Sequence, residues 1–343
     1  MALRLSVLDQ STAIAGRSQD ESIRESMALA RYCESLGYAR YWLAEHHNHD
    51  TIAGTAPEVL MAAIAATTHS IRVGSAGIML PNHSTFKVAE QFRVLEAIAP
   101  GRIDLGLGQA PGSDRLTAHA LNPNVDQAAA DFPAHIRDLM AWLDGSPLAA
   151  EHPFHRLRAF PSGPSVPEVW ILGSSDYGAQ VAAHFGLPYC FAHFITDGMG
   201  AEQAIGLYRQ RYRPSPRFPA PYAALCVWAL AAEHETDAAH LFASRERWKC
   251  ARDRGQLLPV MSPEDAAAHP YTPAERAQID ELRRTAFFGA APRLAQRLRR
   301  LAADCQVEEV AILTWCFDAQ ARRHSYQLLA QEFELVPRTS ETL

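Results

Sequence analysis

The 343-residue sequence lacks the features that would set it apart from ordinary globular proteins. No apolar run is long enough to cross a bilayer, since the longest lies at about residues 220–232, and the first ten residues turn polar too early for a signal peptide. No dense tract of Lys and Arg is present, and 32 basic against 38 acidic side chains give a net charge of −6. These absences predict a cytoplasmic protein that binds neither membranes nor nucleic acid.

Paired cysteines are also missing, and so are short repeats and low-complexity segments. No C-x-x-C pair occurs, so the sequence predicts neither a zinc ribbon nor a disulfide framework. The six cysteines stand far apart, at Cys33, Cys190, Cys226, Cys250, Cys305 and Cys316. The first three lie in apolar runs, which predicts that they are small core residues. With 48% hydrophobic and 20% charged residues, the chain can bury a large core.

Short apolar strands alternate with helical stretches along most of the sequence. The expected strands are 3–8, 38–43, 71–80, 103–107, 169–172, 189–194, 223–231 and 310–314. The expected helices between and after them are 20–36, 57–67, 86–98, 178–185, 201–212, 291–301 and 319–333. Eight parallel strand–helix units fit a (β/α)8 barrel better than an open sheet, which would leave strands over.

Two segments interrupt this alternation. Residues from about 113 to 165 follow the fourth strand and contain one expected helix, 134–143. Residues from about 236 to 290 follow the seventh strand and are expected to form a long, charged, helical insertion. The prediction is therefore an α/β protein with a single domain, residues 1–343, built as a (β/α)8 TIM barrel with insertions after strands 4 and 7.

Histidines gather where the second strand ends, in AEHHNHD at residues 44–50. The active site of a (β/α)8 barrel lies at the carboxyl ends of its strands. Alternation along the strand places Ala44 and His46 on one face, and Glu45 and His47 on the other. The histidines could be ordinary loop residues, metal ligands, or a general acid/base. Because the later strand ends supply almost no further His or Asp, a metal site is not predicted.

Glycines gather at the ends of the third and fourth strands, in VGSAGIMLP and RIDLGLGQAPG. We expect small residues there, Gly106 and Gly108 among them, to leave a flat-walled hollow for a ligand. The glycines could instead only relieve crowding inside the barrel. A dinucleotide-binding phosphate turn is not favoured, because the spacing departs from G-x-G-x-x-G.

Serines follow the fifth strand, in LGSSDYGAQ. Ser174, Ser175 or Asp176 could cap the helix expected from Gly178, and free amide groups of its first turn could hold a phosphate. Together with a hollow for a flat ring, this predicts a planar cofactor that carries a phosphate. Flavin mononucleotide (FMN) fits that description better than a metal ion.

Four segments taken together resemble the bacterial-luciferase-like flavin monooxygenases. They are RYWLAEHH (40–47), IRVGSAGIMLPNHS (71–84), KVAEQFRVLEAIAPGRIDLGLGQAPG (87–112) and VWILGSSDYGAQVAAHFGLP (169–188). The resemblance covers nearly the whole chain and is greatest to single-chain bacterial members, including ones of actinobacterial aromatic polyketide pathways. It implies antibiotic biosynthesis and a barrel that binds reduced FMN. It also implies that O2 adds at the flavin C4a, and that the C4a-peroxide hydroxylates or epoxidises a small substrate such as an aromatic polyketide.

The resemblance also assigns roles to individual residues. His46 matches the family's histidine beside the flavin, which is taken as an acid/base. Ala76 and Gly77 match the pair that lines the flavin ring, often through a non-proline cis peptide bond. The cofactor-binding residues expected in this way are Ser75, Ala76, Gly77, Gly108, Gln109, Ser174, Ser175 and Gly178. No metal ligand is expected.

The sequence departs from the family pattern at three of these positions. Gln109 stands where the subgroup usually has an arginine near the flavin phosphate, and Gly178 stands where a hydroxyl residue is common. Both changes leave phosphate recognition to backbone amides and two serines, with less assistance from charge. Gly108 occupies the position of the luciferase reactive cysteine, so no thiol chemistry is expected there.

Competing functions remain open from the sequence. The leading one is a two-component monooxygenase that receives reduced FMN from a separate flavin reductase, in agreement with the absence of a nicotinamide-binding fingerprint. The alternatives are a deazaflavin (F420)-dependent oxidoreductase, a non-catalytic flavin-binding accessory protein, and a metal-dependent hydrolase built on the histidines. The expected partners are a small-molecule substrate, O2, the reductase, and a second copy of the chain in a homodimer.

Overall fold

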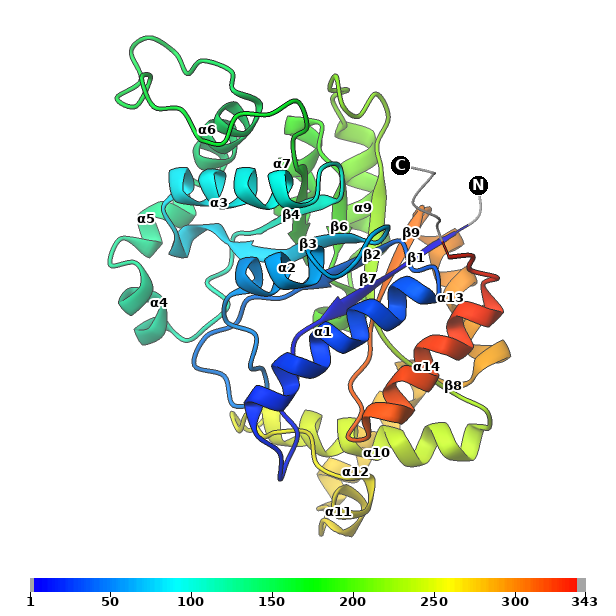
Figure 1. Cartoon of the computed structure of the whole chain (residues 1–343). Helices are drawn as coiled ribbons and strands as arrows, with labels where there is room; N and C mark the ends of the chain where they lie inside the picture. The colour runs from blue at the N-terminus through cyan, green and yellow to red at the C-terminus, as the bar shows by residue number, and fades with distance from the viewer. Residues whose placement is uncertain (1–2, 338–343) are drawn as a thin grey trace.

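Eight parallel strands close into a ring, and helices cover the outside of the ring (Figure 1). The computed structural model describes residues 3–337, so residues 1–2 and 338–343 of the expected domain lie outside the described residues. The strands of the ring are β1 (Arg4–Asp9), β2 (Arg40–Leu43), β3 (Arg72–Met79), β4 (Ile103–Gly108), β5 (Glu168–Gly173), β6 (Tyr189–Phe191), β7 (Ala223–Ala232) and β9 (Glu309–Leu313). They follow one another around the ring in this order, and β9 pairs back with β1. The predicted (β/α)8 barrel is confirmed.

The helices outside the ring begin and end at signals that the sequence contains. They are α1 (Gln19–Ser35), α2 (Pro57–Ala65), α3 (Thr85–Ile98), α7 (Asp176–Phe185), α9 (Ala201–Arg211), α13 (Ala291–Asp304) and α14 (Ala319–Glu332). The side chains of Ser18, Ser84 and Asp318 accept backbone N–H groups at the starts of α1, α3 and α14. Gly37 follows α1 with φ +89°, and a Cβ there would lie 2.6 Å from the Val336 backbone.

The two expected insertions are present, but each contains more structure than predicted. The first holds α4 (Arg115–Leu121), α5 (Val125–Ala130) and α6 (Phe132–Asp144), where one helix was expected. The second holds α10 (Glu235–Arg252), α11 (Pro263–Ala268), α12 (Pro273–Thr285) and the strand β8 (Phe287–Ala290). Figure 1 shows α10–α12 at the end of the barrel opposite the chain termini. The helices α4 and α5 are too short to show a 3.6-residue period, which is why the sequence pattern did not reveal them.

Three further expectations need correction. The seventh strand is extended sideways by β8, which pairs in parallel with residues 229–232 of β7 and makes a ninth strand. The sixth strand ends at Phe191 rather than at residue 194, because the short helix α8 (His193–Thr196) begins there. A 3-10 helix, η1 (Leu80–Asn82), likewise takes the last residue of the expected third strand.

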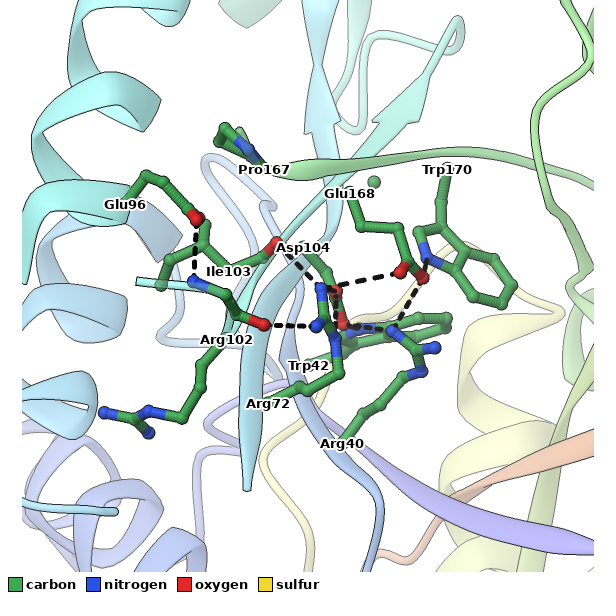
Figure 2. Close-up of polar contacts among 12 residues, drawn as sticks. Arg40, Trp42, Arg72, Glu96, Arg102, Ile103, Asp104, Pro167, Glu168 and Trp170 are labelled. Atoms are coloured by element: carbon green, nitrogen blue, oxygen red, sulfur yellow. Dashed lines mark hydrogen bonds and ion pairs between the residues drawn. The ribbon is translucent and has the colours of Figure 1, made fainter. Parts of the chain in front are cut away.

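At the amino ends of the strands, charged side chains fill the ring and pair with one another (Figure 2). Arg40 Nη1 donates to Asp104 Oδ2 at 2.8 Å and lies 3.0 Å from Glu168 Oε1, and its Nε lies 3.1 Å from Glu309 Oε1. Arg72 Nε donates to Asp104 Oδ1 at 2.8 Å. Burial alone would raise the pKa of Asp104, but the two guanidinium groups hold it below its ordinary value. This end of the barrel is a closed network of ion pairs.

Apolar side chains pack on both faces of the strands. One cluster lies between strands and helices, and a second, which includes Leu8, Trp42 and Leu313, lies on the other face of the strands. All six cysteines are buried and unbridged, as the sequence predicted for three of them. Within residues 3–337, no helix is long and apolar enough to cross a membrane.

Candidate active site

A cavity of about 400 Å³ opens at the carboxyl ends of the strands. This volume lies in the usual range for small-molecule and cofactor sites, roughly 300–1,000 Å³. Eight of the nine residues expected at the site line the cavity: His46, Ala76, Gly77, Gly108, Gln109, Ser174, Ser175 and Gly178. The ninth, Ser75, is buried and does not reach the lining.

The wall formed by β3 and β4 is flat because its residues are small. The Ala76–Gly77 peptide bond is cis, as the resemblance led us to expect. The pairing of β3 with β4 shifts register between Ala76 and Ile78 at the same place. A Cβ on Gly77 would lie 2.8 Å from Leu172 Cδ1, and one on Gly108 would lie 2.8 Å from Met79 Sδ. The Cβ on Gly77 would also lie 2.9 Å from the Gly106 carbonyl oxygen, so the backbone itself requires glycine there. At Gly108 the nearest atoms belong to the flexible Met79 side chain, which could move.

Gly106 and Ser75 have a different role from the one expected. A Cβ on Gly106 would lie 2.2 Å from the Ser75 carbonyl oxygen, so this glycine lets the two strands approach and does not face a ligand. The Ser75 hydroxyl donates to the Gly106 carbonyl at 3.0 Å and accepts from the Gly106 N–H at 3.1 Å. For Gly106, the alternative that glycine relieves crowding in the barrel is the better explanation.

The side-chain hydroxyls of the two serines after β5 make no capping hydrogen bond to the following helix. Ser175 is the N-cap of the ten-residue helix α7, yet its side chain makes no capping hydrogen bond. Within residues 3–337, no side-chain hydrogen bond ties down Ser174 Oγ or Ser175 Oγ. Asp176 in the first turn is engaged by Gln203 Nε2 at 2.7 Å. Two hydroxyls and the N-terminal amides of α7 are thus available to an anion.

Gln109 and Gly178, the two departures from the family pattern, have structural partners of their own. Gln109 Nε2 donates to the Ala129 carbonyl of α5 at 2.9 Å, which ties the cavity wall to the first insertion. Gly178 is buried where α7 packs on the barrel, and a Cβ there would lie 3.4 Å from a ring carbon of Tyr189. A larger residue at 178 would press against that ring.

His46 reaches the cavity from the loop after β2. Its Nδ1 lies 3.3 Å from the Gly112 carbonyl oxygen, and its Nε2 lies 3.4 Å from Gln10 Nε2. These partners assign the proton to Nδ1 and leave the lone pair on Nε2. Burial, assisted by neighbouring His49, lowers the pKa of His46 to about 4, although the Gly112 carbonyl acts in the opposite direction. The imidazole is therefore neutral at pH 7.

The other histidines of the cluster belong to a different network, centred on Glu45. His47 Nε2 and His83 Nε2 both donate to Glu45 Oε1 at 2.8 Å, and the Met79 N–H donates to Glu45 Oε2 at 2.8 Å. Burial alone would raise the pKa of Glu45, but these hydrogen bonds lower it to about 2. The carboxylate fixes the loop after β2 against β3 and so orients His46. Among the described residues, no group of three or more His, Cys, Asp or Glu side chains is arranged to hold a metal ion.

Sequence reasoning missed the side of the cavity formed by β1, β9 and α10. Gln10 Oε1 accepts from the Trp315 indole N–H at 3.1 Å, so Gln10 links Trp315 to His46. Arg245 and Trp248 of α10 complete this wall. The signal that the sequence offered was a pair of aromatic residues near strand ends, Trp228 and Trp315, which core packing alone could explain.

Solved structures of low sequence identity show the same barrel. The oxygenating constituent of 3,6-diketocamphane monooxygenase from Pseudomonas putida, in complex with FMN, is 17% identical with a TM-score of 0.70, and the match covers 97% of this chain and 98% of that one. An F420-dependent secondary alcohol dehydrogenase is 14% identical with a TM-score of 0.67, over 98% and 99% of the two chains. These likenesses establish the fold, which serves both flavin and deazaflavin proteins.

Closer relatives decide the family. The family described as luciferase-like monooxygenase matches residues 3–309. A luciferase-like monooxygenase of Escherichia coli (strain K12) is 38% identical over 95% of this chain and 96% of that protein. N-acetyl-S-alkylcysteine monooxygenase of Bacillus subtilis (strain 168) is 35% identical over 96% and 97%. The crystal structure of apo-MsnO8 is 33% identical, with a TM-score of 0.88 over 98% of this chain and 100% of that one. The chain belongs to the luciferase-like monooxygenase family.

Proposed function

We propose that this protein is a flavin-dependent monooxygenase that takes reduced FMN from a separate reductase and uses O2 to hydroxylate or epoxidise a small organic substrate. The observation that carries the proposal is the division of one cavity between two kinds of group. The hydroxyls of Ser174 and Ser175, which make no capping hydrogen bond, lie on one wall. The neutral imidazole of His46 reaches the same cavity from another wall. Family relatives named as monooxygenases support the reaction class.

The walls of the cavity fit FMN. The flat surface of Ala76, Gly77 and Gly108 suits a planar ring system, and Ser174 with Ser175 at the start of α7 suits the phosphate. When bound, reduced FMN supplies the electrons that activate O2. The apolar side chains of Leu172, Leu313 and Trp42 also line the cavity and would keep bulk water away from a bound ring.

His46 then handles a proton at its Nε2 atom. Because its pKa is about 4, the imidazole offers a lone pair at neutral pH and can accept a proton from the substrate or pass one on. The Gly112 carbonyl holds Nδ1–H, which keeps the Nε2 lone pair directed away from the loop. Gln10 lies beside Nε2 and orients the ring.

The test is an anaerobic titration of the purified protein with reduced FMN, followed by mixing with air-saturated buffer. The expected result is saturable binding and a reoxidation rate that differs from that of free reduced FMN. NADH or NADPH added without a reductase should not reduce the bound flavin. Absence of binding up to millimolar FMN, with binding of reduced F420 instead, would replace the proposal by the deazaflavin alternative. Binding of FMN without oxidation of any organic compound would favour an accessory protein.

We also propose a homodimer formed through the early helices. Val59 on α2 and Val94 and Ile98 on the adjacent α3 are exposed by 65%, 48% and 45%, although aliphatic side chains gain from burial. Light scattering at micromolar concentration should give twice the mass of the chain, and Val59→Glu with Val94→Glu should give monomers. A monomeric wild-type protein would contradict the homodimer.

A further inference from the structure

Arg245 is a buried cation in the wall of the cavity. It lies on α10, is only 6% exposed, and contributes to the cavity lining. Its guanidinium carbon lies 4.3 Å from the centre of the Trp228 ring and 5.9 Å from that of Trp315. The guanidinium is therefore held against two indoles, which offset part of its desolvation but form no hydrogen bond with it.

Arg245 has no polar partner among residues 3–337. Its Nε is buried without a hydrogen-bond partner, and no carboxylate lies within ion-pair distance of the guanidinium. The nearest acidic influence, Asp197, is engaged by Lys249 Nζ at 3.0 Å. Burial lowers the pKa of Arg245 to about 9, so the group still carries its charge at neutral pH. Buried charges in proteins are normally paired, and a pair of parallel hydrogen bonds to a carboxylate is the geometry that guanidinium groups favour.

The charge of the cavity points in the same direction. Among the described residues, its lining contains two arginines, Arg245 and Arg252, and no Asp or Glu. Arg252 is half-exposed and its Nε lies 3.3 Å from Asp253 Oδ1, so its positive charge is compensated by an ion pair. Arg245 is the one that presents an uncompensated positive charge to a ligand.

Arg245 also lies on the wrong side of the ring to serve the flavin phosphate. In the eight-membered ring, β7 and β9 stand across from β3 and β4. Arg245 packs on Trp228 of β7 and on Trp315 just after β9, whereas the proposed flavin wall is formed by β3 and β4, with the serines after β5. The cavity thus has two separate places for an anion.

We propose that Arg245 binds the carboxylate of the organic substrate, so that the substrate class is organic acids whose apolar part lies against Trp315 and Trp248. The proposal rests on the proposed function in that the flavin takes the opposite wall. It assigns Arg245 a role in substrate recognition and none in proton transfer.

The experiment compares two probes of the same shape and different charge, 4-phenylbutanoate and 4-phenylbutanamide. Binding to the purified protein is followed by quenching of tryptophan fluorescence, because Trp248 and Trp315 line the cavity and Trp228 packs against Arg245. We expect the dissociation constant of the acid to be at least about tenfold lower than that of the amide. Arg245→Met should abolish this preference, and Arg245→Lys should retain only part of it, since an ammonium lacks the planar fork. Arg252→Met, which removes the paired arginine of the same wall, should keep it.

Three results would overturn the proposal. One is equal binding of acid and amide to the wild-type protein, and another is a preference that survives Arg245→Met. The third is a loss of FMN affinity in Arg245→Met while riboflavin affinity is unchanged, since Arg245 would then hold the flavin phosphate. Thermal unfolding checks folding: Arg245→Met should melt no lower than the wild type, because it removes an unpaired buried charge. A clear fall would mean a structural role and count against the proposal. If the acid preference holds but FMN does not bind, the proposed function fails while the acid site stands.

Discussion

The two ends of the barrel treat a buried arginine in opposite ways. Arg40 at the amino ends of the strands is 5% exposed and lies against the carboxylates of Asp104, Glu168 and Glu309. Arg245 at the carboxyl ends is 6% exposed, yet it has no carboxylate partner in the described chain. Similar burial with unequal pairing separates a group that holds the fold from a group that is available to a ligand.

The same contrast holds for the other polar groups. The Glu309 carboxylate accepts from the Tyr222 hydroxyl, and the Trp170 indole donates to Glu168. The polar groups at the amino ends of the strands are thus satisfied within the protein. At the carboxyl ends, no hydrogen bond within residues 3–337 engages the hydroxyls of Ser174 and Ser175, and the Nε2 lone pair of His46 faces only the Gln10 amide, at 3.4 Å. Ser174 is half-buried and Ser175 is exposed, so a ligand can take over these hydroxyls from solvent without breaking a hydrogen bond inside the protein.

The largest effect is expected for His46→Ala, which removes the candidate acid/base from the carboxyl ends of the strands. General acid/base catalysis contributes a factor of about 10²–10⁴ in rate, so turnover in a reductase-coupled assay should fall by that order. FMN affinity, measured by titration, should change much less. His49→Ala is the matched control, because this second imidazole also lines the cavity, 5.6 Å from the His46 ring. Unchanged turnover in His46→Ala would remove the histidine from the mechanism.

Arg40→Met removes the central cation of the ion-pair network at the amino ends of the strands. It leaves the buried carboxylates of Asp104 and Glu309 without their shared cation, which should cost about 3–5 kcal/mol in the free energy of unfolding. Urea unfolding followed by circular dichroism measures this loss. The comparison predicts no such loss for Arg245→Met, so similar destabilisation by the two substitutions would show that pairing does not distinguish the two ends.

Gln109→Arg tests the comparison in the opposite direction, because it adds a positive charge at the carboxyl ends of the strands. Gln109 uses its amide to bind the Ala129 carbonyl, whereas an arginine has enough donors for that carbonyl and for a phosphate. Replacing a neutral donor by a charged one should gain around 1 kcal/mol, or several-fold in the dissociation constant of FMN. The gain should shrink in high salt and be absent for riboflavin. An equal gain for riboflavin would place Gln109 away from the phosphate.

The smallest effect is expected for pH. With a pKa of about 4, His46 is only about 3% protonated at pH 5.5, so this residue should leave turnover nearly constant between pH 5.5 and 8. An inflection near pH 6.5 that His46→Ala removes would contradict this.

The lowered pKa of His46 also makes the stability of the fold depend on pH. The unfolded chain protonates His46 first, so its burial lowers stability as the pH falls from about 6.5 to 4. Glu45 adds to the acid sensitivity below pH 4.5, where its proton also favours the unfolded chain. His83, whose pKa is raised chiefly by Glu45 against the effect of burial, acts in the opposite sense: its contribution is present below pH 6.5 and fades above it. Urea-unfolding midpoints from pH 4 to 8 measure the sum, and His46→Gln should flatten the acid side.

The features that the sequence predicted correctly depend on local periodicity. Strand–helix alternation defined the barrel. The expected separation of His46 from Glu45 is also found, although both residues lie beyond the end of β2 at Leu43, where the two-residue period of a strand no longer applies. Gly106 was expected to line the cavity and does not, because β3 approaches β4 so closely that the Ser75 carbonyl fills the space beside it. This approach arises from the pairing of the two strands, whose register shifts between Ala76 and Ile78, and leaves no mark on either strand alone. Arg245 was hidden for a similar reason. It stands in a helix rich in charge, and the partner that satisfies its neighbour Glu246 is Arg283, which lies 37 residues away.

The ninth strand has a consequence for how this barrel can change over evolution. The second insertion leaves the ring at the carboxyl end of β7 and returns through β8, which pairs with residues 229–232 of that same strand. Ring closure is made upstream, where residues 224–228 of β7 pair with β9. Both ends of the insertion are thus anchored on one strand, outside the closure. The segment between them, with Arg245 inside it, is an exchangeable cassette: its sequence and length can diverge between relatives, or be grafted by an engineer, while the ring and the cavity wall formed by β3 and β4 stay unchanged.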